Sequence, residues 1–330
     1  MGVNHSLVVE ILTQAVVYGT PILFAALGEL LAERSGVLNL GVEGMMLVGA
    51  AMGFWGMQRA PGSDATALTL AVLTAAFAGL VMALAFAILV VSLRANQIVS
   101  GLALTIFAGG LGLASYLGND LGLADVPAKH QFGEIDVFGL KDTPVVGPIL
   151  FHQSALVYFS WALTVLIALY LSRTRLGLNV RAVGESPGAA DAMGINVTLY
   201  RYAHVLAGGA LAGIGGACYS LAITPGWTDG DSLVGGAGWI AIALVIFSFW
   251  RPELCLVGAY LFGGLAGGVP AAIQAHNYKA IPAFFKTSEF LNSLPYLMTI
   301  LVLVMVSTSF ARRRIGAPAA LGVPYVREER

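Results

Sequence analysis

The sequence predicts an all-α protein that crosses a membrane several times, a polytopic integral membrane protein. Of its 330 residues, 58% are hydrophobic and only 11% are charged, which is more apolar surface than a soluble core of this size buries. The apolar residues also gather in runs of roughly 20 residues, the length that a transmembrane helix needs. We expect residues 1–330 to form a single transmembrane domain.

Apolar runs predict about nine transmembrane helices, or eight to ten once their boundaries are allowed to move. A polar excursion at 118–152 carries five acidic residues and two lysines, and it divides the chain into halves at 1–117 and 152–312. The apolar runs are 7–31, 42–57, 67–93, 97–117, 155–172, 203–222, 237–250, 254–274 and 294–310.

The basic residues predict which side of the membrane each connection occupies, because cytoplasmic connections are rich in Lys and Arg. If the segment 173–201 is cytoplasmic, twelve arginines lie inside, and one arginine and the four lysines lie outside. The N-terminus and 118–152 are then extracytoplasmic, whereas 173–201 and the tail 313–330 are cytoplasmic.

Two of the runs, 42–57 and 237–250, are short for a bilayer, and each follows a Gly-rich or polar segment, 35–41 or 230–238. Such interruptions at corresponding places in two halves are typical of discontinuous helices whose backbone ends line a pathway. Ordinary short helices at Gly-lined packing seams are the alternative. Glycines four residues apart elsewhere predict close helix packing: Gly209 with Gly213, Gly263 with Gly267, and Gly264 with Gly268.

Asn39 and Glu43 are candidate pathway residues, because a spacing of four would place them on one helix face. A carboxylate inside a membrane span is costly unless it is paired or faces water, which makes Glu43 a functional candidate. The alternative is that Arg34 neutralises Glu43 near the membrane interface. The same two interpretations, a functional or a neutralised carboxylate, apply to Glu29 and Glu33 at the inner end of the first run.

Asn96, Gln97 and Ser100 open the fourth run and complete the candidate pathway set. Their amide and hydroxyl groups suit hydrogen bonds to a polar solute, or to the start of their own helix as a cap. Three tryptophans near expected span ends are predicted to anchor the protein at the membrane interface: Trp227, Trp239 and Trp250.

The segment 173–201 contains a candidate docking helix that ends at Gly194. Ser186 is a helix-capping residue, Pro187 suits the first helical position, and Gly194 can close the helix in the left-handed conformation. Two turns are marginal alone in water, so this helix needs a surface to pack on. That surface is a partner protein, or the helix ends of the same protein.

Four stretches resemble the permease subunits of bacterial ABC importers for nucleosides and simple sugars, in the wider family of branched-chain amino acid and ribose-type permeases. The resemblance covers nearly the whole chain, and its first and last stretches point to the nucleoside-type branch. The stretches are 27–44, 96–103, 184–194 and 316–325.

The resemblance implies that the docking helix engages an ABC ATPase. Glu185, Ala189, Ala190 and Gly194 match the pattern of such permeases, although three residues separate Glu185 from Ala189. Pro187 is the fifth candidate coupling residue. The resemblance also implies a second permease subunit, as a heterodimer rather than a homodimer, and an extracytoplasmic solute-binding protein. The location is then the bacterial cytoplasmic (inner) membrane, in contact with lipid, with no nucleic acid and no cofactor.

Enzyme signatures are missing from the sequence. No lysine follows a glycine, which excludes a Walker A loop, and no HExxH or GxSxG motif occurs. ATP hydrolysis is therefore expected in a separate subunit, and no catalytic or metal-binding residues are assigned. An ion-coupled secondary transporter using Glu29 and Glu43 is the alternative function. An intramembrane enzyme is disfavoured because the five histidines are scattered.

Overall fold

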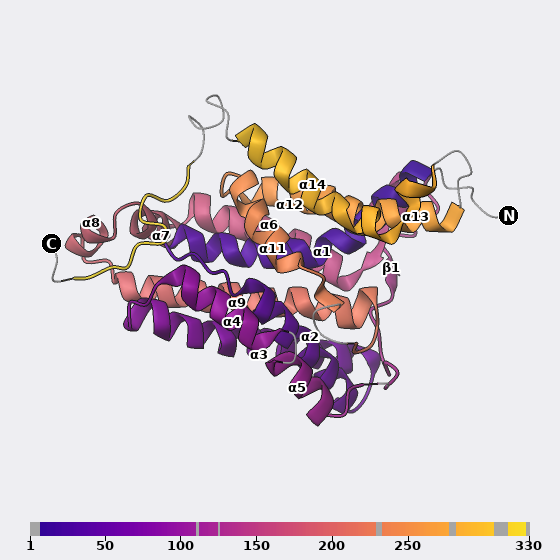
Figure 1. Ribbon diagram of the computed structural model, residues 1–330, viewed down its shortest axis with the longest axis horizontal. Helices are drawn as coiled ribbons and strands as arrows, with labels where there is room; N and C mark the ends of the chain where they lie inside the picture. Colours follow the sequence, from indigo (N-terminus) through magenta and orange to yellow (C-terminus); the bar gives the residue numbers. More distant parts are fainter. Residues whose placement is uncertain are drawn as a thin grey trace.

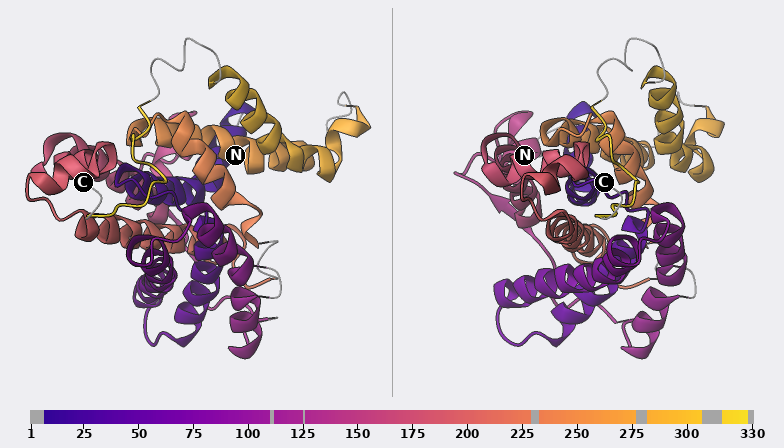
Figure 2. Two further views of the ribbon diagram at one scale, coloured as in Figure 1. Left: turned by 60° about the vertical axis from the view of Figure 1, so that its left-hand side comes forward. Right: turned by 90° about the vertical axis from the view of Figure 1, so that its left-hand side faces the viewer.

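A computed structural model describes residues 7–109, 112–124, 126–228, 233–276, 282–306 and 316–327. In it α1 and α9 lie side by side through the middle of the molecule, and α2 and α3 pack on α9 while α12 packs on α1 (Figures 1 and 2). The α-helices are α1 (Leu7–Arg34), α2 (Val42–Arg59), α3 (Asp64–Ala87), α4 (Gln97–Ala108), α5 (Leu113–Asp120), α6 (Ala155–Arg173), α7 (Arg175–Glu185), α8 (Pro187–Ala192), α9 (Val197–Cys218), α11 (Ala237–Phe247), α12 (Pro252–Gly263), α13 (Val269–His276) and α14 (Ser288–Val306).

Four π-helical turns and one 3₁₀ turn extend or join these helices. They are η1 (Ile88–Ser92), η2 (Gly147–Phe151), η3 (Tyr219–Ile223), η4 (Gly264–Gly268) and the 3₁₀ turn η5 (Ala283–Lys286). Within the described residues, six helical stretches are long and apolar enough to cross a membrane. The expected count of about nine is not confirmed: α11 has only 11 residues, and 307–310, the end of the last predicted run, lies outside the described residues. The six stretches are Leu7–Arg34, Asp64–Ser92, Gln97–Asp120, Ala155–Arg173, Val197–Ile223 and Pro252–Ile273.

Glycines bring the central helices into backbone contact. A Cβ added at Gly209 would lie 2.6 Å from the carbonyl oxygen of Gly79, and one added at Gly213 would lie 2.2 Å from that of Ala75. Gly208 of α9 makes the corresponding contact with α1: a Cβ added at Gly208 would lie 2.6 Å from the carbonyl oxygen of Gly28. The predicted packing role of the Gly209 and Gly213 spacing is therefore confirmed, with α3 as the partner helix.

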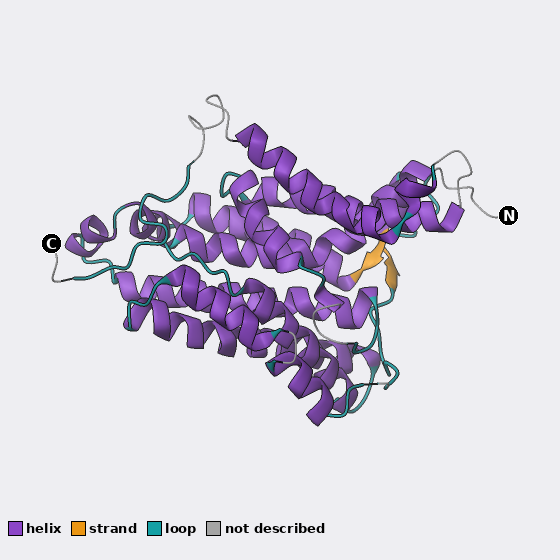
Figure 3. Cartoon of the chain, viewed as in Figure 1, coloured by secondary structure: helices purple, strands orange, loops and turns teal. Residues whose placement is uncertain are grey.

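A two-stranded antiparallel sheet lies at one end of the molecule, so the all-α expectation is wrong in this detail (Figure 3). Strand β1 (Glu134–Asp136) pairs with β2 (His152–Ser154), and the two belong to the polar excursion and its end. Strands of three residues are too short for a period-2 pattern to predict them. A contact of 2.6 Å between Glu134 Oε2 and His152 Nε2 adds to the pairing.

The opposite end carries α7 and α8 (Figure 1). Segment 173–201 was expected to be a loop with one short helix, but α7 occupies 11 of its residues. Thr174 caps α7, since its hydroxyl oxygen accepts a hydrogen bond of 3.0 Å from the Gly177 amide. The glycines at 177 and 184 obscured this helix in the sequence, because glycine is a poor helix former.

Candidate functional site

Glu43 joins the start of α2 to the start of α11. Its Oε1 accepts a hydrogen bond of 3.0 Å from the amide of Gly236, and its Oε2 accepts one of 2.6 Å from the amide of Gly238. Gly236 has the left-handed φ of +83° and precedes the first residue of α11. The Glu43 carboxylate therefore binds the free amides and the positive end of the α11 dipole.

From this junction α2 and α11 run to opposite ends of the molecule. At the end of α2, Gln58 donates to the carbonyl oxygen of Pro127 in the polar excursion, at 2.7 Å. Beyond α11, the carbonyl oxygen of Trp250 accepts from Arg34 at 2.8 Å, close to α7. At 1.5 Å per residue, α2 spans about 27 Å and α11 about 16 Å, and their sum of about 43 Å compares with a bilayer of about 40–45 Å that includes the headgroups. Glu43 thus lies between the two ends of the molecule, where it is 6% exposed.

Side chains satisfy the backbone of segment 35–41, which precedes α2 and is not helical. Non-helical backbone at membrane depth needs such partners, because lipid offers none. The bonds are Leu38 N to Gln97 Oε1 at 2.7 Å, Asn39 N to Glu29 Oε1 at 2.8 Å, Gly41 N to Asn39 Oδ1 at 2.9 Å, and Thr105 Oγ1 to the Leu40 carbonyl oxygen at 2.9 Å.

The five predicted pathway residues have different surroundings. Asn39 lies before α2, so it does not share a helix face with Glu43, contrary to expectation. Gln97 is buried at the start of α4, where it holds segment 35–41, and Ser100 is buried one turn later. Asn96 is exposed and caps α4 by accepting from the Val99 amide at 3.0 Å.

The fully buried carboxylates of Glu29 and Glu33 support the end of α1. Trp250 donates from Nε1 to Glu33 Oε2 at 2.5 Å, while Arg34 donates to the carbonyl oxygen of the same tryptophan. Arg34 therefore binds Trp250 and not Glu43. Trp250 is 3% exposed, and Trp227 is 6% exposed, so neither is the interfacial anchor that was expected. A tryptophan indole that has a buried hydrogen-bond acceptor suits the interior.

We expect Glu43→Gln to destabilise the folded protein. A glutamine amide has one acceptor oxygen, and its NH₂ group would face a backbone N–H, so a buried donor loses its partner at a cost of about 1–3 kcal/mol. Thermal unfolding in detergent should show a lower midpoint, whereas the exposed Glu289→Gln should leave it unchanged. A variant with wild-type thermal stability and reduced transport would contradict this structural role and place Glu43 on the solute path.

At the other candidate site, α8 is a six-residue helix with a left-handed C-terminal turn. Gly194 has a φ of +83°, its amide donates to the Asp191 carbonyl at 2.9 Å, and the Ile195 amide donates to the Ala190 carbonyl at 3.0 Å. These two bonds make a Schellman motif, as the sequence suggested for Gly194. Pro187 occupies the first turn, but the Ser186 side chain makes no cap bond.

The docking-helix residues divide into buried and exposed groups. Ala190 is 3% exposed and packs with Val183 and Val197, so it anchors α8 to the protein itself. Ala189 is exposed, and the Met193 side chain, at 83% exposure, extends into solvent. The surface that remains for another molecule therefore includes Ala189, Ala192 and Met193.

The chain segment 316–327, here called the tail strap, ties α7 and α8 to the rest of the structure. It reaches both helices and the turn at Gly36 that leads into segment 35–41. Its bonds are Ala319 N to Glu185 Oε2 at 3.3 Å, Ala320 N to the Gly184 carbonyl at 2.9 Å, Gly322 N to the Gly36 carbonyl at 3.3 Å, Arg201 Nη1 to the Val323 carbonyl at 3.1 Å, and an Arg327–Asp191 ion pair of 3.3 Å.

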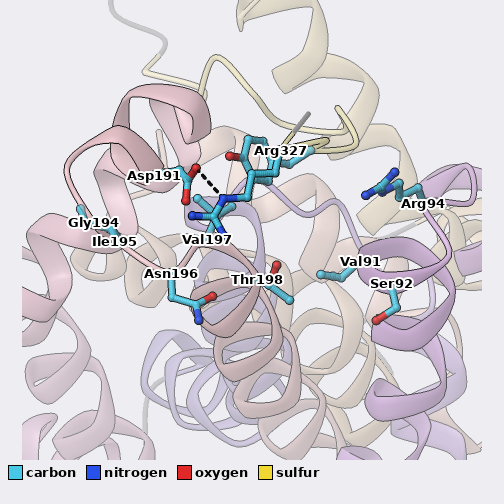
Figure 4. A pocket seen from close by; sticks show the side chains of 11 residues that line it. Val91, Ser92, Arg94, Asp191, Gly194, Ile195, Asn196, Val197, Thr198 and Arg327 are labelled. Atoms are coloured by element: carbon cyan, nitrogen blue, oxygen red, sulfur yellow. Dashed lines mark ion pairs between the residues drawn. The ribbon is translucent and has the colours of Figure 1, made fainter. Parts of the chain in front are cut away.

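A polar cavity of about 510 Å³ lies between the end of α8, the start of α9 and the tail strap. Figure 4 shows Asp191 and Arg327 facing each other in it, with Arg94 on the opposite side. Sequence reasoning missed the strap contacts, since they join positions more than 120 residues apart. In the part of the chain that the structure describes, no cluster of three or more His, Cys, Asp or Glu side chains could hold a metal ion.

Comparison with known proteins agrees with this architecture. Residues 11–311 match the family described as branched-chain amino acid transport system / permease component. The putative glucose ABC transporter permease protein TsgC13 of Haloferax volcanii is 37% identical, over 96% of this chain and 98% of its own length. The nucleoside permease protein NupC of Lactococcus lactis and the guanosine permease protein NupQ of Bacillus subtilis are each 35% identical over 97% of both chains. The chain therefore belongs to the branched-chain amino acid transport system permease family.

Proposed function

We propose that this permease subunit forms half of the translocation pathway of an ATP-driven nucleoside importer in the bacterial cytoplasmic membrane. The observation that carries the proposal is the meeting of α2 and α11 at Glu43, which the proposal places at membrane depth. Two half-helices that start at one point and run in opposite directions are typical of transport pathways. The nucleoside and guanosine permeases among the relatives favour a nucleoside, and a simple sugar is the second solute class.

The ATPase partner would dock on α8. The six-residue helix has one buried face, through Ala190, and presents Ala189 and Met193 to the outside. Leu176 and Leu178 on α7, each 57% exposed, add further apolar side chains at the same end of the molecule. Exposed apolar side chains that gather at one end suit a protein partner. Because the chain has no Walker A motif, the partner supplies ATP hydrolysis.

The complete importer would contain a second permease subunit and an extracytoplasmic solute-binding protein. A heterodimer of permeases is favoured by the nucleoside-type branch that the stretches 27–44 and 316–325 resemble. The two-stranded sheet and the polar excursion lie at the end opposite to α8 (Figure 3), where a binding protein would deliver the solute. In this proposal the ATPase and the binding protein occupy opposite ends of the molecule.

The proposed sidedness predicts the reactivity of introduced cysteines. Asp136→Cys, in exposed β1, should react with an impermeant thiol reagent added outside intact cells, whereas Met193→Cys should react only after the membrane is opened. The buried Cys218 and Cys255 are first replaced by alanine. The opposite labelling pattern would show that the orientation is reversed. Labelling of both cysteines from outside would contradict the proposed placement of the two ends on opposite sides of the membrane.

Uptake measurements test the proposed function. Proteoliposomes that contain this chain, its partner permease and the ATPase should take up radiolabelled guanosine when ATP is enclosed and the binding protein is present. A protonophore should leave this uptake unchanged, because ATP and not an ion gradient drives it. Uptake that needs no ATP and stops with the protonophore would show an ion-coupled secondary transporter instead. Transport of glucose in place of guanosine would assign the sugar as solute.

A further inference from the structure

A second cavity lies beside the Glu43 junction. Its volume is about 400 Å³, and it includes Gly235 and Ala237, which flank the Gly236 amide that Glu43 binds. Cavities of about 300–1,000 Å³ are the size that holds small ligands. Because it adjoins the start of α11, this cavity lies at the same level of the molecule as Glu43. None of the polar residues that the sequence suggested for the pathway lines it.

Three tyrosines from three different elements line this cavity, which we call the tyrosine cavity. Tyr18 comes from α1, Tyr219 from η3 and Tyr296 from α14. Asn292, one turn before Tyr296, adds an amide, and the other walls include Ile22 and Leu233. No charged side chain occurs among the described residues that line it.

The backbone around the cavity makes room for the aromatic rings. A Cβ added at Gly267 would lie 2.1 Å from the ring of Tyr18, so this ring rests directly on the Gly267 backbone in η4. A Cβ added at Gly236 would lie 2.8 Å from the Tyr296 hydroxyl oxygen. Tyr219 and Gly267 both lie in π-helical turns, which occur frequently at functional sites.

We propose that the tyrosine cavity holds the solute during its passage and takes a neutral nucleoside by stacking its base on a tyrosine ring. The inference rests on the proposed function and names the place and chemistry of solute contact. Aromatic rings stack on any nucleobase, because every base has an apolar face. The tyrosine hydroxyls and the Asn292 amide offer the few hydrogen bonds that a base edge and a ribose need.

Other solute classes fit the lining less well. A hexose carries hydroxyl groups all around its ring, and the apolar side chains of Ile22 and Leu233 would leave some of them without partners. A nucleotide phosphate finds no cationic side chain in the described lining. The positive end of α11, which would otherwise attract an anion, is already bound by the Glu43 carboxylate.

The first test compares tyrosine variants in the reconstituted importer. Tyr296→Ala should lower ATP-dependent guanosine uptake by about tenfold, the effect of losing about 1.4 kcal/mol of stacking. Tyr296→Phe, which keeps the ring, should restore most of the uptake. Tyr116→Ala is the matched control, because Tyr116 is a similarly exposed tyrosine on α5, outside the cavity. If Tyr296→Ala transports guanosine as the wild type does, the proposal is overturned.

The second test needs no ATP and so separates this proposal from the proposed function. Ala266→Cys, at a lining position with no proposed role in binding and in the background without Cys218 and Cys255, should react with a small thiol reagent more slowly in the presence of guanosine, and at an unchanged rate with glucose or guanosine monophosphate. Equal protection by glucose, or none by guanosine, would overturn the nucleoside assignment. A wild-type importer without ATP-driven uptake, but with guanosine protection of a cysteine at position 266, would contradict the proposed function and support the cavity assignment.

Discussion

Replacing Gly213 with alanine should prevent most of the protein from accumulating in a folded form. Gly213 lies where α9 touches two other helices: its added Cβ would be 2.2 Å from the carbonyl oxygen of Ala75 in α3, and Gly49 of α2 also packs directly on its backbone. Backbone atoms cannot rotate out of the way, so the helices must separate. Overpacking of side chains costs about 1–3 kcal/mol, and forcing backbones apart should cost at least the upper part of that range.

Gly258 on α12 offers a matched comparison for Gly213. A Cβ added at Gly258 also has its nearest atom at 2.2 Å, but that atom is the terminal methyl carbon of the Leu244 side chain, which can change rotamer. Size-exclusion chromatography of the detergent-solubilised proteins should therefore show a monodisperse peak for Gly258→Ala and little or none for Gly213→Ala. Similar yields of the two variants would mean that the α3–α9 contact is not close in the membrane.

The sequence predicts this kind of contact but not its partners. Glycines four residues apart identify the α9 face that packs closely, because small residues at that spacing form one stripe of a helix. Nothing in the pattern says that α3, rather than any other apolar helix, fits on it. The membrane class follows from composition alone, and the left-handed Gly194 follows from local turn chemistry. The first depends on the composition of the chain and the second on neighbouring residues, so neither requires knowledge of distant contacts, which is why they could be predicted.

The candidate site depends on contacts between distant parts of the chain. Glu43 and Gly236 are separated by 193 positions, so the sequence could mark Glu43 as a costly carboxylate without naming the amides that stabilise it. The same limit applies to the tyrosine cavity, whose three rings come from α1, η3 and α14. Tyrosines in apolar helices are common packing residues, and only their convergence distinguishes these three. Asn39 was placed on a helix face because the start of α2 was not known.

The contacts of α8 bear on the link between ATP hydrolysis and transport. The tail strap bonds to Glu185 beside α8 and to the turn at Gly36, and segment 35–41 leads from that turn to Glu43. A displacement of α8 by an ATPase would therefore reach the Glu43 junction through covalent chain and hydrogen bonds. This route is a physical connection between two sites, and its coupling is to be measured.

Gly194→Val should abolish this link while leaving insertion into the membrane intact. No atom lies within 4 Å of a Cβ added at Gly194, so the substitution acts only through its φ of +83°. A left-handed residue other than glycine costs about 1–2 kcal/mol, and a β-branched residue fits that region worst. The chain leaving α8 should then take another direction, and solute-stimulated ATP hydrolysis in the reconstituted importer should fall by about tenfold or more.

Gly122→Val controls for backbone strain. Gly122 follows α5 at the other end of the molecule, has a φ of +64° and likewise has no atom within 4 Å of an added Cβ. Its valine variant carries the same strain away from α8, so it should insert normally and keep stimulated ATP hydrolysis near the wild-type rate. If both variants lose activity equally, the strain acts on the whole fold. If Gly194→Val retains ATPase association and transport, α8 only connects α7 to α9, and the ATPase must dock elsewhere on this end of the permease.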